Sequence, residues 1–284
     1  MKNYLSLVII VKDEGEYVNE FIEYYRLLGV DHFYFYDNDS AIPLAQSIKK
    51  HSAYVTINNI SGKKRQLDAY NHYLDNYKQD SRWAGFIDLD EFIVPKMKYK
   101  LSDFLKDYEH ADGFGINWVI YGDDNHEVKP AGLITENYTR REVNQNPHIK
   151  SIVNPNRVVE PESPHYFKLV PGSTYIDAKN NPITGPFNQN LSIDIIQINH
   201  YYTKSVAEYL KKAQRGRADN GEQRDVKTEF EPNRLIWNEY LDTCLIDKYM
   251  PDLKKATSAS DTDQLPVAKG GLLQKLASLI GLRK

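Results

Sequence analysis

Residues 83–91 read Trp-Ala-Gly-Phe-Ile-Asp-Leu-Asp-Glu, an apolar stretch that runs directly into a group of acids. A short run that is apolar on both faces is typical of a strand buried in a parallel sheet. Open α/β sheets bind their ligands at the carboxyl ends of such strands. We therefore expect a strand that ends at Ile87, with Asp88, Asp90 and Glu91 at a ligand-binding edge.

The segments before this strand alternate between short apolar runs and helical patterns. Short connections between strand, helix and strand are typical of the βαβ unit, in which the two strands are parallel. Residues 1–95 therefore predict an α/β fold, with a doubly wound, mostly parallel sheet and flanking helices. The expected strands are 4–11, 32–36, 54–57 and 83–87, and the expected helices are 17–28, 41–50 and 63–77.

The rest of the chain is more irregular. Residues 96–200 hold most of the prolines and mix short strands with long loops. A small, polar, proline-containing segment, 256–268, predicts a linker. The tail, 269–284, has leucines at helical spacing and a basic polar side, so we expect a basic amphipathic helix there. The other expected elements are strands 113–120 and 193–198 and C-terminal helices 205–217 and 235–249.

The overall composition excludes several classes of protein. With 41% hydrophobic residues among 284, the chain has enough apolar material for a sizeable core. The net charge of −3 is unlike that of a dedicated nucleic-acid binder, which carries a basic balance. The single cysteine, Cys244, rules out an intramolecular disulfide framework and a cysteine-rich zinc site.

The sequence favours a cytoplasmic location. The longest near-apolar run, 5–11, is far shorter than the stretch of about 20 apolar residues that a membrane-spanning helix needs. No small-residue cleavage site follows the first residues, which argues against a secretory signal. The basic tail suits peripheral contact with the anionic inner face of a membrane, or docking on the protein body, and the sequence leaves both open.

Asp88 and Asp90 are the strongest chemical signal in the chain. Two carboxylates this close at the end of a strand repel each other, and a divalent cation relieves that repulsion. Mg²⁺ or Mn²⁺ takes one or two carboxylates and leaves positions for substrate phosphates. An ordinary acidic loop is the alternative, because Asp-X-Asp is common by chance. The buried strand before the motif favours the metal site.

Two phosphate chemistries share this arrangement of acids. In phosphohydrolases of the haloacid dehalogenase type, the first acid of such a motif, here Asp88, is the nucleophile. Those enzymes want Thr or Val where this chain has Phe92, although residues 122–124 fit their later acidic motif. The other chemistry is glycosyl transfer, in which the metal stabilises the diphosphate leaving group. A non-catalytic nucleotide-sugar or glycan binder is a third hypothesis, against which the intact motif argues.

The sequence as a whole resembles one family of transferases. Val-Ile-Ile-Val-Lys-Asp-Glu at 8–14, followed by a helix and by 33–40, resembles the opening of GT-A-fold glycosyltransferases. Further segments, in the same order as in the family, narrow the resemblance to glycosyltransferase family 92 and its bacterial relatives over residues 4–240. These segments are 65–72, 86–92, 117–122, 150–153, 199–205 and 215–219.

This resemblance implies a single GT-A-like catalytic domain, 1–255. Its nucleotide-sugar-binding half is 1–95, and its acceptor-side half, irregular at first, is 96–255. The implied function is metal-dependent, inverting transfer of a hexose from a nucleotide diphosphate sugar, here expected to be a UDP-sugar, to a glycan or glycolipid hydroxyl. Synthesis of surface polysaccharide or lipopolysaccharide is the process that an enzyme of this kind suggests.

The resemblance also implies roles for particular residues. Asp88 and Asp90 match the metal and diphosphate motif, and His200 lies where a late histidine completes the metal ligands in many GT-A enzymes. A packed or capping histidine is the alternative for His200, and a solvated basic face is the alternative for the cations after it. The implied nucleotide-sugar-binding residues are Val11, Glu14, Asp37, Arg65, Asp88, Leu89, Asp90, Lys204 and Arg215.

An inverting transferase also needs a base for the acceptor hydroxyl and a surface for the acceptor sugar. Asp124 and Asp123 are the candidates for the base from their place in the chain, with Glu91 as a third, and a plain turn is the alternative for Asp123 and Asp124. Aromatic rings stack on sugar faces, although core packing is equally compatible with these residues. The expected acceptor-binding residues are Trp118, Tyr121 and Lys150; Lys150 and His165 match family positions.

Overall fold

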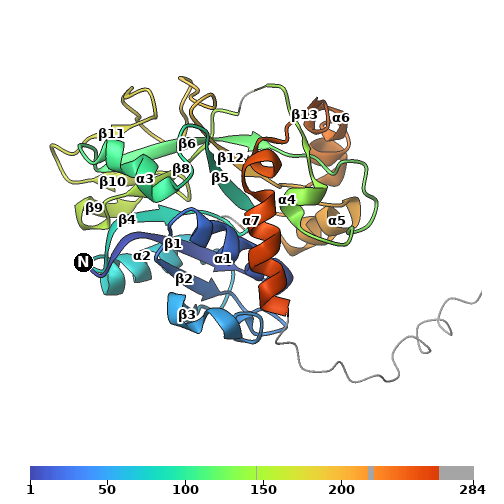
Figure 1. The fold of residues 1–284 in the computed structure, drawn as a ribbon, viewed down its shortest axis with the longest axis horizontal. Helices are drawn as coiled ribbons and strands as arrows, with labels where there is room; N and C mark the ends of the chain where they lie inside the picture. Colours follow the sequence, from blue (N-terminus) through green and yellow to red (C-terminus); the bar gives the residue numbers. More distant parts are fainter. Residues whose placement is uncertain (145, 217–220, 262–284) are drawn as a thin grey trace, which may run out of the picture.

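The computed structural model describes residues 1–144, 146–216 and 221–261. Its centre is a nine-stranded sheet in the order β3-β2-β1-β4-β8-β6-β12-β5, with β11 beside β6 (Figure 1). The strands are β1 (Asn3–Val11), β2 (His32–Asp37), β3 (Val55–Asn59), β4 (Ser81–Phe86), β5 (Glu91–Pro95), β6 (Gly113–Ile120), β8 (Ile149–Val153), β11 (Tyr175–Ile176) and β12 (Ile196–His200). Short pairs outside this sheet are β9 (Val158–Pro161) with β10 (Phe167–Leu169) and β7 (Arg140–Arg141) with β13 (Tyr240–Leu241).

Most strands of the sheet run in one direction. β3, β2, β1 and β4 are parallel, and β6 and β12 share their direction, whereas β8 and β5 run antiparallel to their neighbours. The α/β class, the mostly parallel sheet and the flanking helices are therefore confirmed. The sheet is a mixed one, because two of its strands, β8 and β5, run in the opposite direction. The carboxyl ends of β1, β2, β4, β6 and β12 all lie along one edge.

Helices cover both faces of the sheet (Figure 1). The residues of β1 alternate between two cores: Leu5, Leu7 and Ile9 pack with α1 and α7, and Val8 and Ile10 pack with α2. This burial on both faces explains why the strand is apolar throughout. The helices are α1 (Val18–Leu27), α2 (Gln66–Tyr77), α3 (Leu101–Leu105), α4 (Ile134–Asn137), α5 (Val206–Arg215), α6 (Arg234–Trp237) and α7 (Cys244–Asp261).

The helix predicted at 41–50 is wrong. Two short 3₁₀ turns, Leu44–Gln46 and Lys49–Tyr54, occupy this region. The cause is local, because Pro43 disfavours helical backbone at the residue before it and itself has an extended ψ of 130°. Carboxylates then hold the N–H groups of the loop. Asp37 accepts from the Leu44 N–H at 2.8 Å, and Asp13 accepts from the Ala41 N–H at 2.7 Å.

The helix predicted at 235–249 is also wrong as one element. It is broken into α6, the short strand β13 and α7, because Asp242 pairs with Arg141 at 2.7 Å and accepts from the Cys244 N–H at 3.0 Å, where α7 begins. α7 then packs along α1 and continues to Asp261, so the predicted linker does not begin at 256 (Figure 1). The rest of that linker and the predicted tail helix, 269–284, lie outside the described residues.

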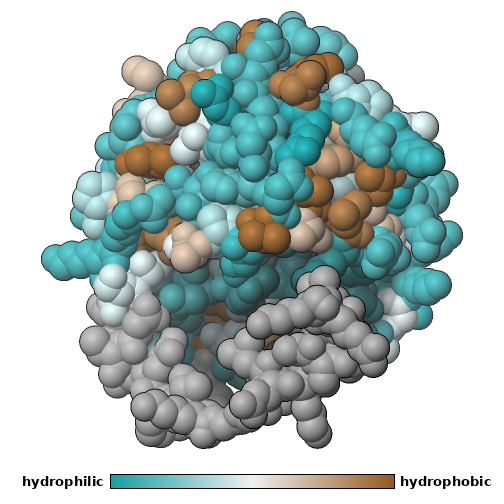
Figure 2. Space-filling model, turned by 90° about the vertical axis from the view of Figure 1, so that its right-hand side faces the viewer, coloured by the Kyte–Doolittle hydropathy of each residue, from teal (hydrophilic) through white to brown (hydrophobic). Residues whose placement is uncertain are grey.

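Within the described ranges, none of the helices combines the length and apolarity needed to cross a membrane. The face that carries α5, α6 and β13 is mainly hydrophilic, with hydrophobic residues in separate spots (Figure 2). Leu235, Ile236 and Leu241, on α6 and β13, are among the exposed apolar side chains of the molecule.

Glu142 makes the stability of the sheet edge depend on pH. Its side chain accepts from the Ile120 N–H at 3.1 Å, at the end of β6, and burial raises its pKa from 4.5 to about 7. An acid whose pKa is higher in the folded protein than in the unfolded chain makes its full contribution to stability below the pKa of the unfolded chain, where it is protonated in both states. That contribution is lost as the pH rises through 7. Glu142→Gln keeps an acceptor oxygen but does not ionise. We expect its free energy of unfolding, relative to that of wild type, to increase by about 1 to 2 kcal/mol from pH 5 to pH 8, allowing for partial exposure.

Urea unfolding of both proteins at the two pH values measures this difference. Glu239→Gln makes the same charge change at an exposed position and serves as the control. A stability difference between Glu142→Gln and wild type that stays constant with pH would show that Glu142 ionises normally in the fold.

Candidate functional site

A cleft of about 740 Å³ lies at the carboxyl edge of the sheet. Its walls come from the ends of β1, β6 and β12, the turn between β4 and β5, and α5 with the loop that follows. Acids from the sheet edge and cations from α5 therefore line one space. The predicted site residues that line it are Val11, Glu14, Asp88, Leu89, Asp90, Trp118, Lys150, His200 and Arg215.

Strand register brings His200 to the acidic turn. β4 ends at Phe86, the chain turns, and β5 begins at Glu91. β12 runs antiparallel to β5 with His200 opposite Glu91, and the Tyr201 N–H donates to the Asp90 carbonyl at 2.8 Å. Two segments more than a hundred residues apart thus meet at the same point of the edge.

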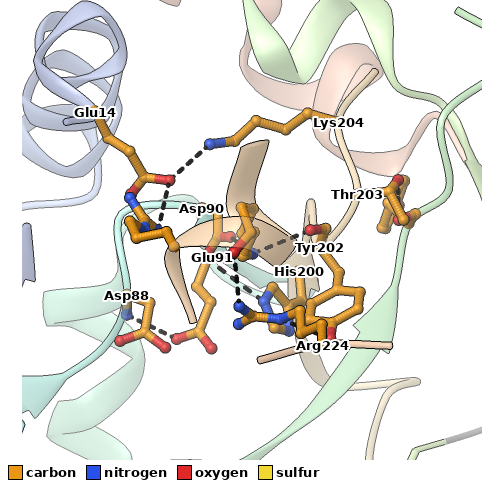
Figure 3. A network of polar contacts seen from close by, with 12 residues as sticks. Glu14, Asp88, Asp90, Glu91, His200, Tyr202, Thr203, Lys204 and Arg224 are labelled. Atoms are coloured by element: carbon orange, nitrogen blue, oxygen red, sulfur yellow. Dashed lines mark hydrogen bonds and ion pairs between the residues drawn. The ribbon is translucent and has the colours of Figure 1, made fainter. Parts of the chain in front are cut away.

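Asp88 is held by two neighbours. Its carboxylate accepts from Gln66 Nε2 at 2.9 Å and pairs with Lys150 Nζ at 3.0 Å. The Lys150 side chain is only 1% exposed; its burial lowers its pKa, but Asp88 and Glu91 outweigh this and raise the pKa above its usual value. Lys150 is therefore a buried cation, and behind Asp88 the Glu91 carboxylate accepts from the Asp88 N–H at 2.9 Å (Figure 3).

Asp90 has a different pair of neighbours. One carboxylate oxygen lies 2.6 Å from Lys212 Nζ, and the other lies 3.5 Å from His200 Nε2. Burial alone would raise the pKa of Asp90, but Lys212 and His200 outweigh it and hold the pKa well below its usual range. Burial also lowers the pKa of His200, so the site contains an ionised carboxylate beside a neutral imidazole.

The predicted trio of metal ligands is not assembled. In the described part of the chain, no three His, Cys, Asp or Glu side chains come together as a metal-binding group. Lys150 and Gln66 hold Asp88, which leaves Asp90 and His200 as the adjacent pair. An ionised carboxylate with a neutral imidazole fits a divalent cation whose other ligands are diphosphate oxygens and water. The residues therefore fit two protein ligands in place of the predicted three.

At the other end of the cleft, Glu14 links the loop after β1 to α5. Lys204 Nζ lies 3.2 Å from one carboxylate oxygen of Glu14 (Figure 3). Arg215 Nη2 lies 3.7 Å from the same oxygen. Arg215 also donates to the carbonyl oxygen of Lys12. Lys204 does not line the cleft and supports Glu14 from behind.

Two further residues that the sequence assigns to the nucleotide sugar lie outside the cleft lining. Asp37 is buried and uses both carboxylate oxygens to hold the loop after β2, through the N–H groups of Ser40 and Leu44. Arg65 is exposed, pairs with Asp68 at 2.6 Å and donates to the Ser61 carbonyl. Both residues shape loops beside the cleft.

Lys212 and Arg224 are cleft residues that the sequence analysis missed. Arg224 Nε donates to the Tyr202 hydroxyl at 3.2 Å, and Arg224 Nη1 donates to the Lys212 carbonyl at 3.3 Å (Figure 3). The spacing of Lys212 and Arg215 on one side of a helix was a usable signal. It also fits an ordinary surface pair between Glu208 and Lys212, which is why spacing alone does not identify the site.

Aromatic rings and histidines line the opposite part of the cleft. The ring of Trp118 stacks on His148 at 5.2 Å between centroids and contacts His165 at 4.9 Å and His200 at 4.4 Å. His165 Nδ1 lies 2.8 Å from the Ile149 carbonyl oxygen, which can only accept, so the proton of the neutral ring is on Nδ1. Burial and then the charge of Lys150 lower the pKa of His165 to about 3, which leaves Nε2 as an acceptor.

The residues predicted to be the base are not in the cleft lining. Asp123 is fully buried and pairs with Arg234 at 2.5 Å and Asn238 at 2.7 Å, which fixes α6. Asp124 accepts from Thr139 Oγ1 at 2.9 Å and so joins the loop after β6 to the end of α4. The structure gives both residues structural contacts, as the turn alternative expects.

Glu91 and Tyr121 are also placed away from the cleft lining. Glu91 is completely buried behind Asp88, and burial raises its pKa well above the usual range. Tyr121 is a core residue whose ring packs on Tyr201 at 4.9 Å. Of the predicted acceptor residues, Trp118 and Lys150 are the two that line the cleft.

Known proteins resemble this chain in sequence. The curated relatives include glycosyltransferase family 92 proteins of Arabidopsis thaliana, with 26% identity over 61% of this chain and 32% of that protein, and of Ricinus communis, with 26% identity over 69% and 35%. One from Oryza sativa subsp. japonica is 26% identical over 69% of this chain and 33% of that protein. The chain thus matches about a third of the length of these relatives.

Solved structures resemble it more distantly. S. aureus TarS 1–349 in complex with UDP has a TM-score of 0.37 and 12% identity over 54% of this chain and 47% of that chain. UDP-glucose pyrophosphorylase complexed with UDP-glucose has a TM-score of 0.32 and 7% identity over 92% of this chain and all of that chain. The resemblance found in the sequence is confirmed by the family's own sequence model, which matches residues 9–231. The chain belongs to glycosyltransferase family 92.

Proposed function

We propose that this chain transfers a sugar from a nucleotide diphosphate sugar to a glycan hydroxyl in the cleft at the sheet edge. The observation that carries the proposal is the acidic turn at Asp88 and Asp90, which lines the cleft beside the cations of α5. Membership of glycosyltransferase family 92 supports glycosyl transfer and weakens the phosphohydrolase alternative. UDP is the proposed nucleotide of the donor.

The donor half of the proposed site is electrostatic. Lys212, Arg215 and Arg224 line the cleft and would take the diphosphate oxygens through charge-assisted hydrogen bonds. Val11 and Glu14, at the end of β1, line the same part of the cleft and are the proposed neighbours of the nucleoside. Ligand binding at the carboxyl ends of parallel strands agrees with the behaviour of open α/β sheets.

A divalent cation is the proposed cofactor, Mn²⁺ or Mg²⁺. Asp90 and His200 would hold it, and when bound it would neutralise the charge that develops on the leaving diphosphate. Lys150 and Gln66 keep the Asp88 carboxylate in place beside this position, through contacts of 3.0 and 2.9 Å. The buried ammonium group of Lys150 allows the side chains of Asp88, Asp90 and Glu91 to lie close together before any ligand is bound.

The acceptor half of the proposed site is uncharged apart from Lys150. The flat rings of Trp118 and His148 offer a stacking surface for a sugar. His165 Nε2, an acceptor by its tautomer, would receive a hydrogen bond from a sugar hydroxyl. An uncharged sugar bearing free hydroxyls is the acceptor that this chemistry would recognise.

The finer parts of the proposal come from the family resemblance. They are a hexose as the transferred sugar, inversion at its anomeric carbon, and a role in surface polysaccharide or lipopolysaccharide synthesis. A cytoplasmic location, with peripheral contact to the inner face of a membrane through the tail, belongs to the same proposal.

Thermal unfolding with UDP, GDP or CMP, each with and without Mn²⁺, tests the donor site. A ligand that binds only the native state stabilises it by about 2.7 kcal/mol at a hundredfold excess over its Kd. We expect a rise in Tm with UDP that is larger with Mn²⁺ than without it. Asp90→Asn should lose the metal-dependent part, and Asp75→Asn, at an exposed position of α2, should keep it.

An equal rise in Tm with UDP in the presence and absence of Mn²⁺ would contradict the metal site while leaving the nucleotide site standing. No rise with any of the three nucleotides would contradict the proposed donor site as a whole.

Substitution of His165 tests the acceptor half. We expect His165→Ala to raise the KM for the glycan acceptor about tenfold, the effect of losing one hydrogen bond to the substrate. His165→Gln restores an acceptor oxygen and should recover part of the loss. Transfer to a glycan panel and hydrolysis of the UDP-sugar by water, measured side by side, separate the two halves of the site. A parallel loss of donor hydrolysis would assign His165 to the donor half or to the fold.

A further inference from the structure

Lys212 gives Asp90 a cationic partner on the carboxylate oxygen next to the one that faces His200. Its Nζ lies 2.6 Å from one Asp90 carboxylate oxygen and 3.0 Å from the carbonyl oxygen of Tyr202. The other Asp90 oxygen faces His200 Nε2 at 3.5 Å. The Lys212 side chain is 13% exposed and lines the cleft, so it reaches both the acid and the ligand space.

An ammonium group and a divalent cation cannot share this carboxylate without strong repulsion. At the separations inside a cleft, two cations on one acid repel each other unless one of them moves. Asp90 and His200 are the two protein ligands that the structure offers to a metal. Binding of a metal between His200 and the Asp90 oxygen that faces it therefore favours departure of Lys212 from the other oxygen.

The surroundings of Lys212 allow its side chain to move while its backbone stays in place. The residue belongs to α5, which begins with a capping box formed by Ser205 and Glu208. Arg224 donates to the Lys212 carbonyl at 3.3 Å, and Lys212 Nζ lies 4.7 Å from the centre of the Tyr202 ring. A compact ammonium on a flexible four-carbon stem can turn from one anion to another.

We propose that Lys212 is a resident cation that neutralises Asp90 in the donor-free cleft and turns onto the diphosphate when a divalent cation takes its place on Asp90. This inference rests on the proposed function. In the exchange, Asp90 changes one cation for another, and Lys212 changes one anion for another. Metal and nucleotide then bind cooperatively, because each relieves the charge that the other would leave without a partner.

Mn²⁺ titration of the protein without nucleotide tests the first step. Loss of free Mn²⁺ is followed by electron paramagnetic resonance. Tryptophan fluorescence, to which Trp118 contributes with its ring 4.4 Å from that of His200, gives a second signal. We expect Lys212→Met to bind Mn²⁺ about tenfold more tightly than wild type, as when a competitor that occupies the site nine-tenths of the time is removed. Lys211→Met changes an exposed lysine of the same helix and should match wild type.

UDP titration with and without Mn²⁺ tests the second step. For wild type we expect Mn²⁺ to tighten UDP binding, and UDP to tighten Mn²⁺ binding by the same factor. In Lys212→Met, the factor by which Mn²⁺ and UDP tighten each other's binding should be about tenfold smaller. The reason is that this variant lacks both the competitor for Asp90 and one ligand of the diphosphate. Lys212→Gln is a second neutral variant of similar length, in case the methionine protein does not fold.

The outcomes separate this inference from the proposed function. Wild type that binds Mn²⁺ and UDP, with an unchanged or weaker Mn²⁺ affinity in both neutral variants, overturns the resident-cation inference alone. Absence of Mn²⁺ binding in all proteins, with and without UDP, overturns the metal site and this inference together. Mn²⁺ binding that persists in Asp90→Asn would place the ion elsewhere and also overturn the inference.

Discussion

A buried charge needs a partner of opposite sign, and this constraint explains how the cleft is built. Lys150 enters the interior against Asp88, and Lys212 lies against Asp90 at 2.6 Å. At the far end, Lys204 pairs with Glu14 at 3.2 Å. Each pair joins the acids of the first half of the chain to a cation from the second half. Separating the partners of such a pair would leave a buried charge uncompensated, at a high cost in free energy. The two halves of the chain therefore form one site.

The same pairs show how far the sequence alone could be taken. The apolar run before Asp88 placed this acid at the carboxyl edge, and strand direction then required the end of β1 to lie beside it. The approach of His200 follows from the register of β12 on β5, which a family resemblance can suggest and local pattern cannot. Lys212 was missed because its place in the site depends on a contact with Asp90, which lies 122 positions away in the sequence.

The residues predicted to be the base from their place in the chain lie outside the cleft lining for a related reason. Asp123 and Asp124 follow a strand that ends at the correct edge, and an acid there has the chemistry of a base. Their oxygens are instead taken by Arg234, Asn238 and Thr139, which come from elements that the sequence treated separately. Helical spacing failed at 41–50 because Pro43 is extended, and at 235–249 because Asp242 captured the Cys244 N–H.

Electroneutrality explains how a cleft with so many charges can be stable before it binds its ligands. In the structure, Asp90 contacts Lys212, and Glu14 contacts Lys204 and Arg215, so the acids and cations neutralise one another in direct pairs. A nucleotide diphosphate alone would attract the cations and leave the acids without partners, and a metal alone would do the reverse. The proposed ligand, a diphosphate together with a divalent cation, would give both sides new partners at once, which is the reason for proposing the joint ligand over either component.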